Sequence, residues 1–215
     1  MERLRTAILI SGRGTNMQAL LDYCSTAKAA ATISLVVSNV PDAIGLRRAT
    51  EAGISTAVIN HKLYTDRVAF EGVITETLER HDIQLICLAG FMRLLTSGFV
   101  EYWRDKLINI HPSLLPAFKG LNTHVRALEE GVRYTGCTVH YVRAEMDSGP
   151  IILQAAVPIF PDDDPNILAK RVLVAEHRCY PHALSLIARG KTQIIGEKVL
   201  IEEAEAPGLP FFNPI

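Results

Sequence analysis

The stretch ILISGRGTNMQALL, residues 8–21, places an apolar run, a glycine-rich turn and a helix pattern one after another. Thr6–Ile10 predicts a buried strand, and Asn16–Ala27 predicts a helix with one apolar face. Gly12 and Gly14 allow a tight turn between them. The stretch therefore predicts the strand–turn–helix unit from which α/β proteins are built.

The same alternation continues along the first half of the chain. Further strands are expected at Ile33–Val37, Thr56–Ile59, Leu85–Ala89 and Leu107–Ile110. Helices are expected at Gly45–Ala52, at Asp66–Arg80 with Thr65 as its N-cap, and after Thr96 or Ser97. The strands are continuous Ile, Val and Leu runs, so both of their faces should be buried. This pattern predicts an open, mostly parallel twisted sheet with helices on both faces, Rossmann-like in its first half.

The second half of the chain has a different pattern. Cys137–Val142 alternates and Pro150–Ile159 follows it closely, which predicts an antiparallel strand pair added late to the sheet. A long helix should begin at Pro165 with Asp164 as N-cap, and Pro181 should kink or end it. The proline-rich stretch APGLPFFNPI, residues 206–215, is expected to be irregular.

We interpret the 215 residues as one domain. Residues 1–100 would form the half that binds a nucleotide or phosphate, and residues 101–190 would form the catalytic half. Residues 191–215 would be a C-terminal extension. The hydrophobic content of 48% excludes a disordered protein, and the net charge of −1 gives no reason to expect nucleic acid as a partner. Four scattered cysteines without a CxxC motif indicate reduced thiols in a cytoplasmic protein. No apolar run is long enough to span a membrane.

The glycine turn itself is a candidate anion site, because free N–H groups and the helix dipole meet where the helix begins. Met17 stands where a dinucleotide fingerprint needs a third glycine, and Asn39 stands where that fingerprint needs an acid. A single phosphate is therefore favoured over a dinucleotide. The alternative is an ordinary turn in which Thr15 or Asn16 caps the helix.

The second candidate site is INIHPSLLP, residues 108–116. Residues two apart in a strand share a face, so Asn109 and His111 should point the same way. Pro112 ends the strand, which places the pair at the carboxyl edge where open α/β sheets bind ligands. Asn109 can donate to an oxyanion and His111 can transfer a proton. The alternative is that both side chains only cap local backbone groups.

Asp147, in the stretch MDSGP, is the candidate carboxylate that orients His111. Its alternative role is an ordinary turn residue, and Glu145, Asp163 and Asp164 are competing carboxylates. Ser113 lacks the setting of a nucleophilic serine. No metal is expected, because metal ligands have a characteristic spacing that is not found among His111, His124, His140 and His177.

The chain closely resembles the folate-dependent phosphoribosylglycinamide formyltransferases from Arg5 to about Gly190. The resemblance rests on the motifs ILISGRGTNMQAL, VVSN, LAGFMRLL, INIHPSLLP, MDSGPIILQ and AEHRCYP, in that order. NIHPSLLP is shared by the wider formyltransferase superfamily. The combination of the glycine loop with GLNTHVRAL and EHRCYP resembles only the branch of the superfamily that acts on glycinamide ribonucleotide. Thr15 stands where many members of the family have serine, and it keeps the hydroxyl. Arg13 and Asn122 stand at positions that vary in the family, so the resemblance leaves only the fine specificity undetermined there.

The resemblance implies roles for individual residues. Asn109, His111 and Asp147 would be the catalytic residues. The ribonucleotide would be bound by Gly14, Thr15 and Asn16 at its phosphate, by Glu176 at its ribose hydroxyls, and by Pro112. The pterin of the folate would be enclosed by Met92, Arg93, Leu94, Leu95 and the loop Arg143, Ala144, Glu145, Met146 and Asp147, with Asn109 adjacent. Arg67 would lie near the glutamate tail of the folate.

The implied activity is transfer of a formyl group from 10-formyltetrahydrofolate, a co-substrate, to the amine of glycinamide ribonucleotide in purine biosynthesis, without a metal. Three alternatives remain open. A 10-formyltetrahydrofolate hydrolase should carry an extra N-terminal domain, and a methionyl-tRNA formyltransferase should carry a basic C-terminal domain; neither is expected in this chain. A non-enzymatic nucleotide-binding module would not need the Asn–His–Asp set. The expected partners are the two small-molecule substrates, and a homodimer is left open.

Overall fold

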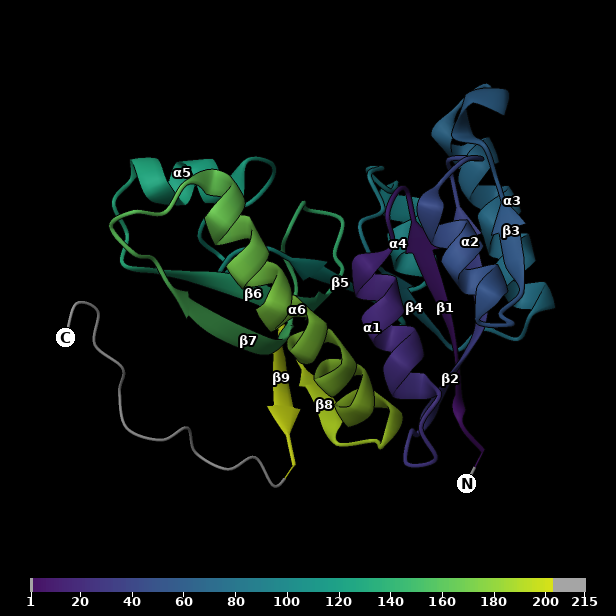
Figure 1. The fold of residues 1–215 in the computed structure, drawn as a ribbon. Helices are drawn as coiled ribbons and strands as arrows, with labels where there is room; N and C mark the ends of the chain where they lie inside the picture. Colours follow the sequence, from purple (N-terminus) through teal and green to yellow (C-terminus); the bar gives the residue numbers. More distant parts are fainter. Residues whose placement is uncertain (1, 203–215) are drawn as a thin grey trace.

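A single large sheet forms the centre of the computed structural model, which describes residues 2–202 (Figure 1). Its strand order is β3-β2-β1-β4-β5-β6-β7. The strands are β1 (Leu4–Ile10), β2 (Ala31–Ser38), β3 (Thr56–Val58), β4 (Leu85–Leu88), β5 (Leu107–His111), β6 (Tyr134–Tyr141) and β7 (Ile151–Pro158). Pairing is parallel from β3 through β5, and β6 and β7 join antiparallel. The predicted parallel sheet with a late antiparallel pair is confirmed.

Helices cover both faces of the sheet. They are α1 (Thr15–Cys24), α2 (Ile44–Glu51), α3 (Arg67–Arg80), α4 (Ser97–Tyr102), α5 (Thr123–Glu129) and α6 (Pro165–Ala188), with a short 3₁₀ helix at His61–Leu63. Ile8 and Ile10 of β1 belong to the core under α1 and α6, whereas Ala7 and Leu9 belong to the core under α3 and α4. All four side chains are fully buried. The continuous apolar run of β1 follows from this burial on two sides.

The structure corrects the predicted cap of α3 and excludes one of the two outcomes predicted for Pro181. Asp66, not Thr65, caps α3, and its side chain accepts a hydrogen bond from the N–H of Ala69 at 2.8 Å. Pro181 does not end α6, which continues to Ala188. Tyr180 and Leu184, on either side of the proline, are fully buried against the sheet. Their packing holds the helix together where the proline removes a backbone hydrogen bond.

The region taken as a C-terminal extension contains structure that the sequence analysis did not predict. β8 (Thr192–Ile195) and β9 (Lys198–Ile201) form a separate antiparallel hairpin. Gly196 in the turn has a φ of 60°, which suits glycine. The hairpin lies beside β7 and α6 (Figure 1). The stretch expected to be irregular, residues 206–215, lies outside the described residues.

The strand order places a switch point at β1. The chain moves from β1 to β2 and β3 on one side, then returns to place β4 on the other side of β1. Ligands of open α/β sheets bind at such a point, beyond the carboxyl ends of the strands. The glycine turn after β1 and the segment after β4 meet here, where the N–H of Ser11 donates to the carbonyl of Gly90 at 3.1 Å.

Candidate active site

The structure brings His111 and Asp147 together at the carboxyl edge of β5. His111 Nδ1 lies 3.4 Å from Asp147 Oδ1, and the two side chains are only 7% and 12% exposed. On the other side of the ring, Nε2 donates to the carbonyl of Phe118 at 2.9 Å. An acceptor thus faces each ring nitrogen. A doubly protonated imidazolium satisfies both contacts, because only that form donates from both nitrogens.

Asp147 is held in place by the backbone around it. Its φ is +47°, a left-handed conformation that aspartate tolerates. Its Oδ2 accepts a hydrogen bond from the N–H of Gly120 at 2.7 Å, which leaves Oδ1 for His111. At Gly149, where φ is +110°, a Cβ atom would lie 2.3 Å from the carbonyl oxygen of Tyr141. Glycine at this position therefore lets the chain return close to β6.

Asn109 has a partner that sequence reasoning missed. His140 lies directly opposite it on β6 and is 1% exposed. His140 Nδ1 faces two carbonyl acceptors, Tyr141 at 2.9 Å and Ser148 at 3.1 Å, so this nitrogen carries the ring proton. Its Nε2 then accepts from Asn109 Nδ2 at 3.4 Å. Burial lowers the pKa of His140, which keeps the ring neutral.

This contact orients the amide of Asn109. With Nδ2 directed at His140, the second N–H of the same nitrogen remains available as a donor. Asn109 and His111 lie on one face of β5, as predicted, because Ile108 and Ile110 between them point into the core under α1 and α6. The site therefore presents an amide donor and an imidazole side by side at the end of a strand.

The glycine turn ends in a helix terminus without a side-chain cap. Gly14, with a φ of 69°, is the N-cap of α1, and neither Thr15 nor Asn16 caps the helix. No acidic residue occupies the first turn. Asn16 instead donates from Nδ2 to Glu176 Oε2 at 2.6 Å, which joins the predicted phosphate loop to the predicted ribose-binding residue. Burial raises the pKa of Glu176, and the hydrogen bond from Asn16 opposes that shift.

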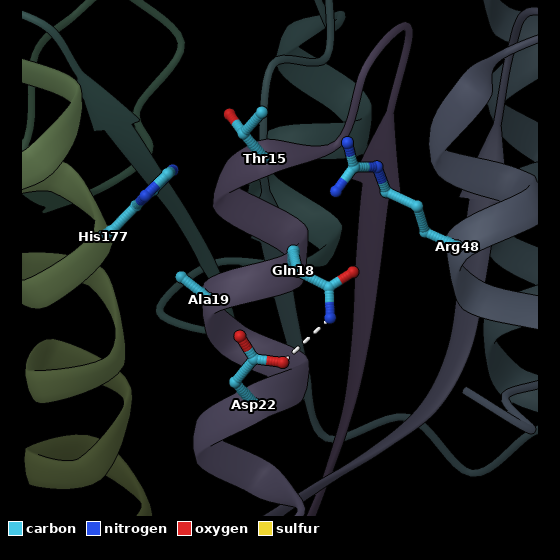
Figure 2. A pocket seen from close by; sticks show the side chains of 6 residues that line it. All are labelled: Thr15, Gln18, Ala19, Asp22, Arg48 and His177. Carbon is cyan, nitrogen blue, oxygen red and sulfur yellow. Dashed lines mark hydrogen bonds between the residues drawn. The ribbon is translucent and has the colours of Figure 1, made fainter. Parts of the chain in front are cut away.

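A pocket of about 320 Å³ opens beside this terminus (Figure 2). Thr15 stands at the end nearest the glycine turn, and side chains from α1, α2 and α6 form the walls. The lining residues are Thr15, Gln18, Ala19, Asp22, Arg48 and His177.

The segment predicted to enclose the pterin, residues 92–95, follows β4 at the switch point. It is anchored at both ends: the N–H of Met92 donates to Ser11 Oγ at 2.8 Å, and the N–H of Thr96 donates to Glu71 Oε1 at 2.8 Å. Glu71 is 4% exposed and also accepts from the hydroxyl of Thr96. Between these anchors, the side chains of Met92 and Leu94 are 68% and 63% exposed. A segment held at both ends by hydrogen bonds thus presents apolar side chains at its surface.

The other predicted folate residues differ in how their side chains are placed. Arg67 is the first residue of α3, one turn before Glu71 and on the same side of that helix. Arg143 is not free: its guanidinium pairs with Asp105 and Glu197, each at 2.9 Å. Any contact of Arg143 with a ligand would have to come from its backbone. The remaining residues of its loop, Ala144, Glu145 and Met146, are exposed.

Two negative observations concern residues 2–202 alone. No group of three or more His, Cys, Asp or Glu side chains in this range could hold a metal ion. No helix in the same range is long and apolar enough to cross a membrane.

Comparison with known proteins shows the family to which the chain belongs. A family model described as Formyl transferase matches residues 4–184. The chain belongs to the formyl transferase family. It is 41% identical over 191 residues to the phosphoribosylglycinamide formyltransferase of Escherichia coli strain K12, covering 89% of this chain and 90% of that protein.

A second relative is much longer than this chain. The human trifunctional purine biosynthetic protein adenosine-3 is 51% identical over 193 residues, which cover 90% of this chain and 19% of that protein. This formyl transferase family member therefore spans about a fifth of the length of the human relative.

Solved structures share the fold over nearly the whole chain. Glycinamide ribonucleotide transformylase 1 from Symbiobacterium toebii matches with a TM-score of 0.90 at 45% identity, covering 93% of this chain and 94% of that one. A formyltetrahydrofolate deformylase from Pseudomonas putida KT2440 matches with a TM-score of 0.83 at 25% identity, covering 93% of this chain and 70% of that one.

Proposed function

We propose that this protein transfers the formyl group of 10-formyltetrahydrofolate to the amine of glycinamide ribonucleotide, a step of purine biosynthesis. The observation that carries the proposal is the His111–Asp147 pair beside Asn109, at the same sheet edge as a phosphate-type glycine loop. The family supplies the formyl transfer, and the relatives of matching length are named for this acceptor.

In the proposed reaction the amine of the ribonucleotide is itself the nucleophile, so no activated serine or cysteine is needed. Its nitrogen attacks the formyl carbon, and the carbonyl oxygen becomes the oxyanion of a tetrahedral intermediate. The free N–H of Asn109 donates to that oxygen, and the positive charge of the His111 imidazolium, whose Nδ1 faces Asp147, stabilises it. Donors fixed before the reaction stabilise developing charge without reorganisation at the moment of attack.

The intermediate then breaks down by loss of the folate. The attacking nitrogen releases a proton, and N10 of the folate takes one up as its bond to the formyl carbon breaks. Asp147 stabilises the imidazolium of His111 and can pass the proton between the two nitrogens through water. Glu176, which accepts a hydrogen bond from Asn16, binds the ribose hydroxyls, and Gly14, Thr15 and Asn16 at the start of α1 bind the phosphate.

A hydrolase is the second candidate, because the similar deformylase from Pseudomonas putida shares the fold over most of this chain. In that reaction water replaces the amine. A spectroscopic assay of tetrahydrofolate formation decides between the two. We expect turnover only when glycinamide ribonucleotide is added. Equal turnover without any acceptor would establish the hydrolase, and turnover with tRNA alone would establish a tRNA formyltransferase.

A further inference from the structure

We propose that Arg48 binds the phosphate of the ribonucleotide and supplies the positive charge that the glycine loop lacks. The inference rests on the proposed function and names a residue that the motifs did not single out. Arg48 lies on α2, outside the loop, and lines the pocket beside the start of α1 (Figure 2).

The backbone contact between α2 and the loop fixes where Arg48 can reach. The N–H of Gly45 donates to the carbonyl of Gly12 at 3.0 Å. A Cβ atom added to Gly14 would lie 3.0 Å from the Cα of Gly45, so the two backbones touch at a distance that suits only glycine. Arg48 follows Gly45 by three residues and therefore lies on the same side of α2. Its guanidinium is directed toward the loop in Figure 2.

Within residues 2–202, Arg48 forms no ion pair and no side-chain hydrogen bond. The adjacent Arg47 is different: its side chain is 77% exposed and lies 3.7 Å from Glu51. Arg48 is partly buried instead. A partly buried guanidinium without a carboxylate is costly unless an anion accompanies it.

The other charged and titratable groups near the pocket do not replace Arg48. Asp22 lies at the far end from Thr15 and accepts from Gln18 Nε2 at 2.8 Å (Figure 2). Burial lowers the pKa of His177, with Asp22 opposing the shift, so the ring is neutral near pH 7. Its Nε2 is buried without a partner among the described residues, so the neutral ring can add a hydrogen bond but no charge.

The chemistry of the ligand explains the need for a cation. The first N–H groups of α1 have no helical partner and no side-chain cap, so they suit an anion. The partial positive charge of these N–H groups balances only part of the charge of a phosphate monoester, which is close to −2. A guanidinium offers two parallel N–H donors to phosphate oxygens and strengthens binding by charge as well as geometry.

The test compares two acceptors, glycinamide ribonucleotide and the corresponding ribonucleoside, which lacks the phosphate. Arg48→Met should raise KM for the ribonucleotide about 10- to 100-fold, as expected when a hydrogen bond to a charged group is lost. KM for the ribonucleoside, KM for the folate and kcat should stay unchanged. Arg48→Lys should lie between wild type and Arg48→Met. Arg47→Met is the matched control and should behave as wild type.

Two results would overturn the assignment. An equal loss with both acceptors would mean that Arg48 only supports the fold. If Arg13→Met raised KM for the ribonucleotide and Arg48→Met did not, the cation that binds the phosphate would be Arg13, the exposed arginine of the loop. If the wild-type protein does not formylate the ribonucleotide, the proposed function fails, and calorimetric binding of ribose 5-phosphate decides on Arg48 separately. Weaker binding of ribose 5-phosphate by Arg48→Met than by wild type would still support the phosphate site. Equal binding by the two proteins, or no binding by wild type, would reject it.

Discussion

Replacement of Asp147 by asparagine tests the catalytic arrangement most sharply, because the structure predicts which contact is lost. The carboxylate accepts from two donors, the N–H of Gly120 at 2.7 Å and His111 Nδ1 at 3.4 Å. An amide has only one oxygen acceptor. Asparagine also tolerates the left-handed φ of +47°, so the backbone should not change.

The amide should keep the shorter contact, to Gly120, and turn its NH₂ group toward His111. His111 Nδ1 must then accept a hydrogen bond, and the only ring proton moves to Nε2, where the carbonyl of Phe118 already accepts at 2.9 Å. The ring becomes neutral and its proton points away from Asp147. We expect kcat to fall by about 10²–10⁴, the usual contribution of acid–base catalysis, which is about 3–5 kcal/mol of transition-state stabilisation.

The assay for Asp147→Asn combines steady-state kinetics with nitrogen NMR of the His111 ring, which reports the nitrogen that carries the proton. KM for the ribonucleotide should change little, because the proposed phosphate site is the loop before α1, away from Asp147. Asp162→Asn, at an exposed carboxylate, is the control and should keep wild-type kcat. A near-normal kcat for Asp147→Asn, with Nδ1 still protonated, would refute the reasoning and leave Asp147 as a turn residue.

Three further predictions concern the substrate pockets. Thr15→Ala should raise KM for the ribonucleotide by up to about 100-fold without changing KM for the folate, since a hydrogen bond to a charged group is lost; a rise in the folate KM alone would mean that the two pockets are reversed. Because burial raises the pKa of Glu176, its carboxylate should protonate above the usual range for glutamate. KM for the ribonucleotide should therefore rise as the pH falls toward that pKa, and Glu176→Gln should remove this pH dependence; an unchanged profile would exclude Glu176 from binding. Ser11→Ala removes the acceptor that fixes the N–H of Met92, so KM for the folate should rise several-fold, and a folate KM equal to wild type would show that this anchor is not needed.

Local patterns were sufficient to predict the seven strands of the large sheet, because burial on both faces leaves continuous apolar runs. The position of Asn109 and His111 on one face also follows from strand geometry alone. That α6 does not end at Pro181, where a kink or an end was predicted, has a tertiary cause: buried neighbours such as Tyr180 hold α6 together across the proline. The hairpin of β8 and β9 did have a local signal, since Gly196 and Glu197 separate two short apolar runs.

The missed parts of the candidate site depend on pairing between distant segments. His140 orients Asn109 because the two lie opposite in antiparallel strands, and no local pattern gives that register. The Glu71 anchor joins α3 to the segment after β4, and Arg48 is brought to the loop by a glycine contact from α2. Each of these residues looks like an ordinary helix or strand residue in the sequence. Only the fold places them beside the predicted site.

The fate of a labelled formyl carbon tests the central claim most directly. Purified protein would receive 10-formyltetrahydrofolate labelled in the formyl group, with and without glycinamide ribonucleotide, and the products would be separated. We predict that the label appears in the formylated amine of the ribonucleotide, and that none is released when the ribonucleotide is absent. Label recovered as formate, at the same rate with and without the ribonucleotide, would contradict the account.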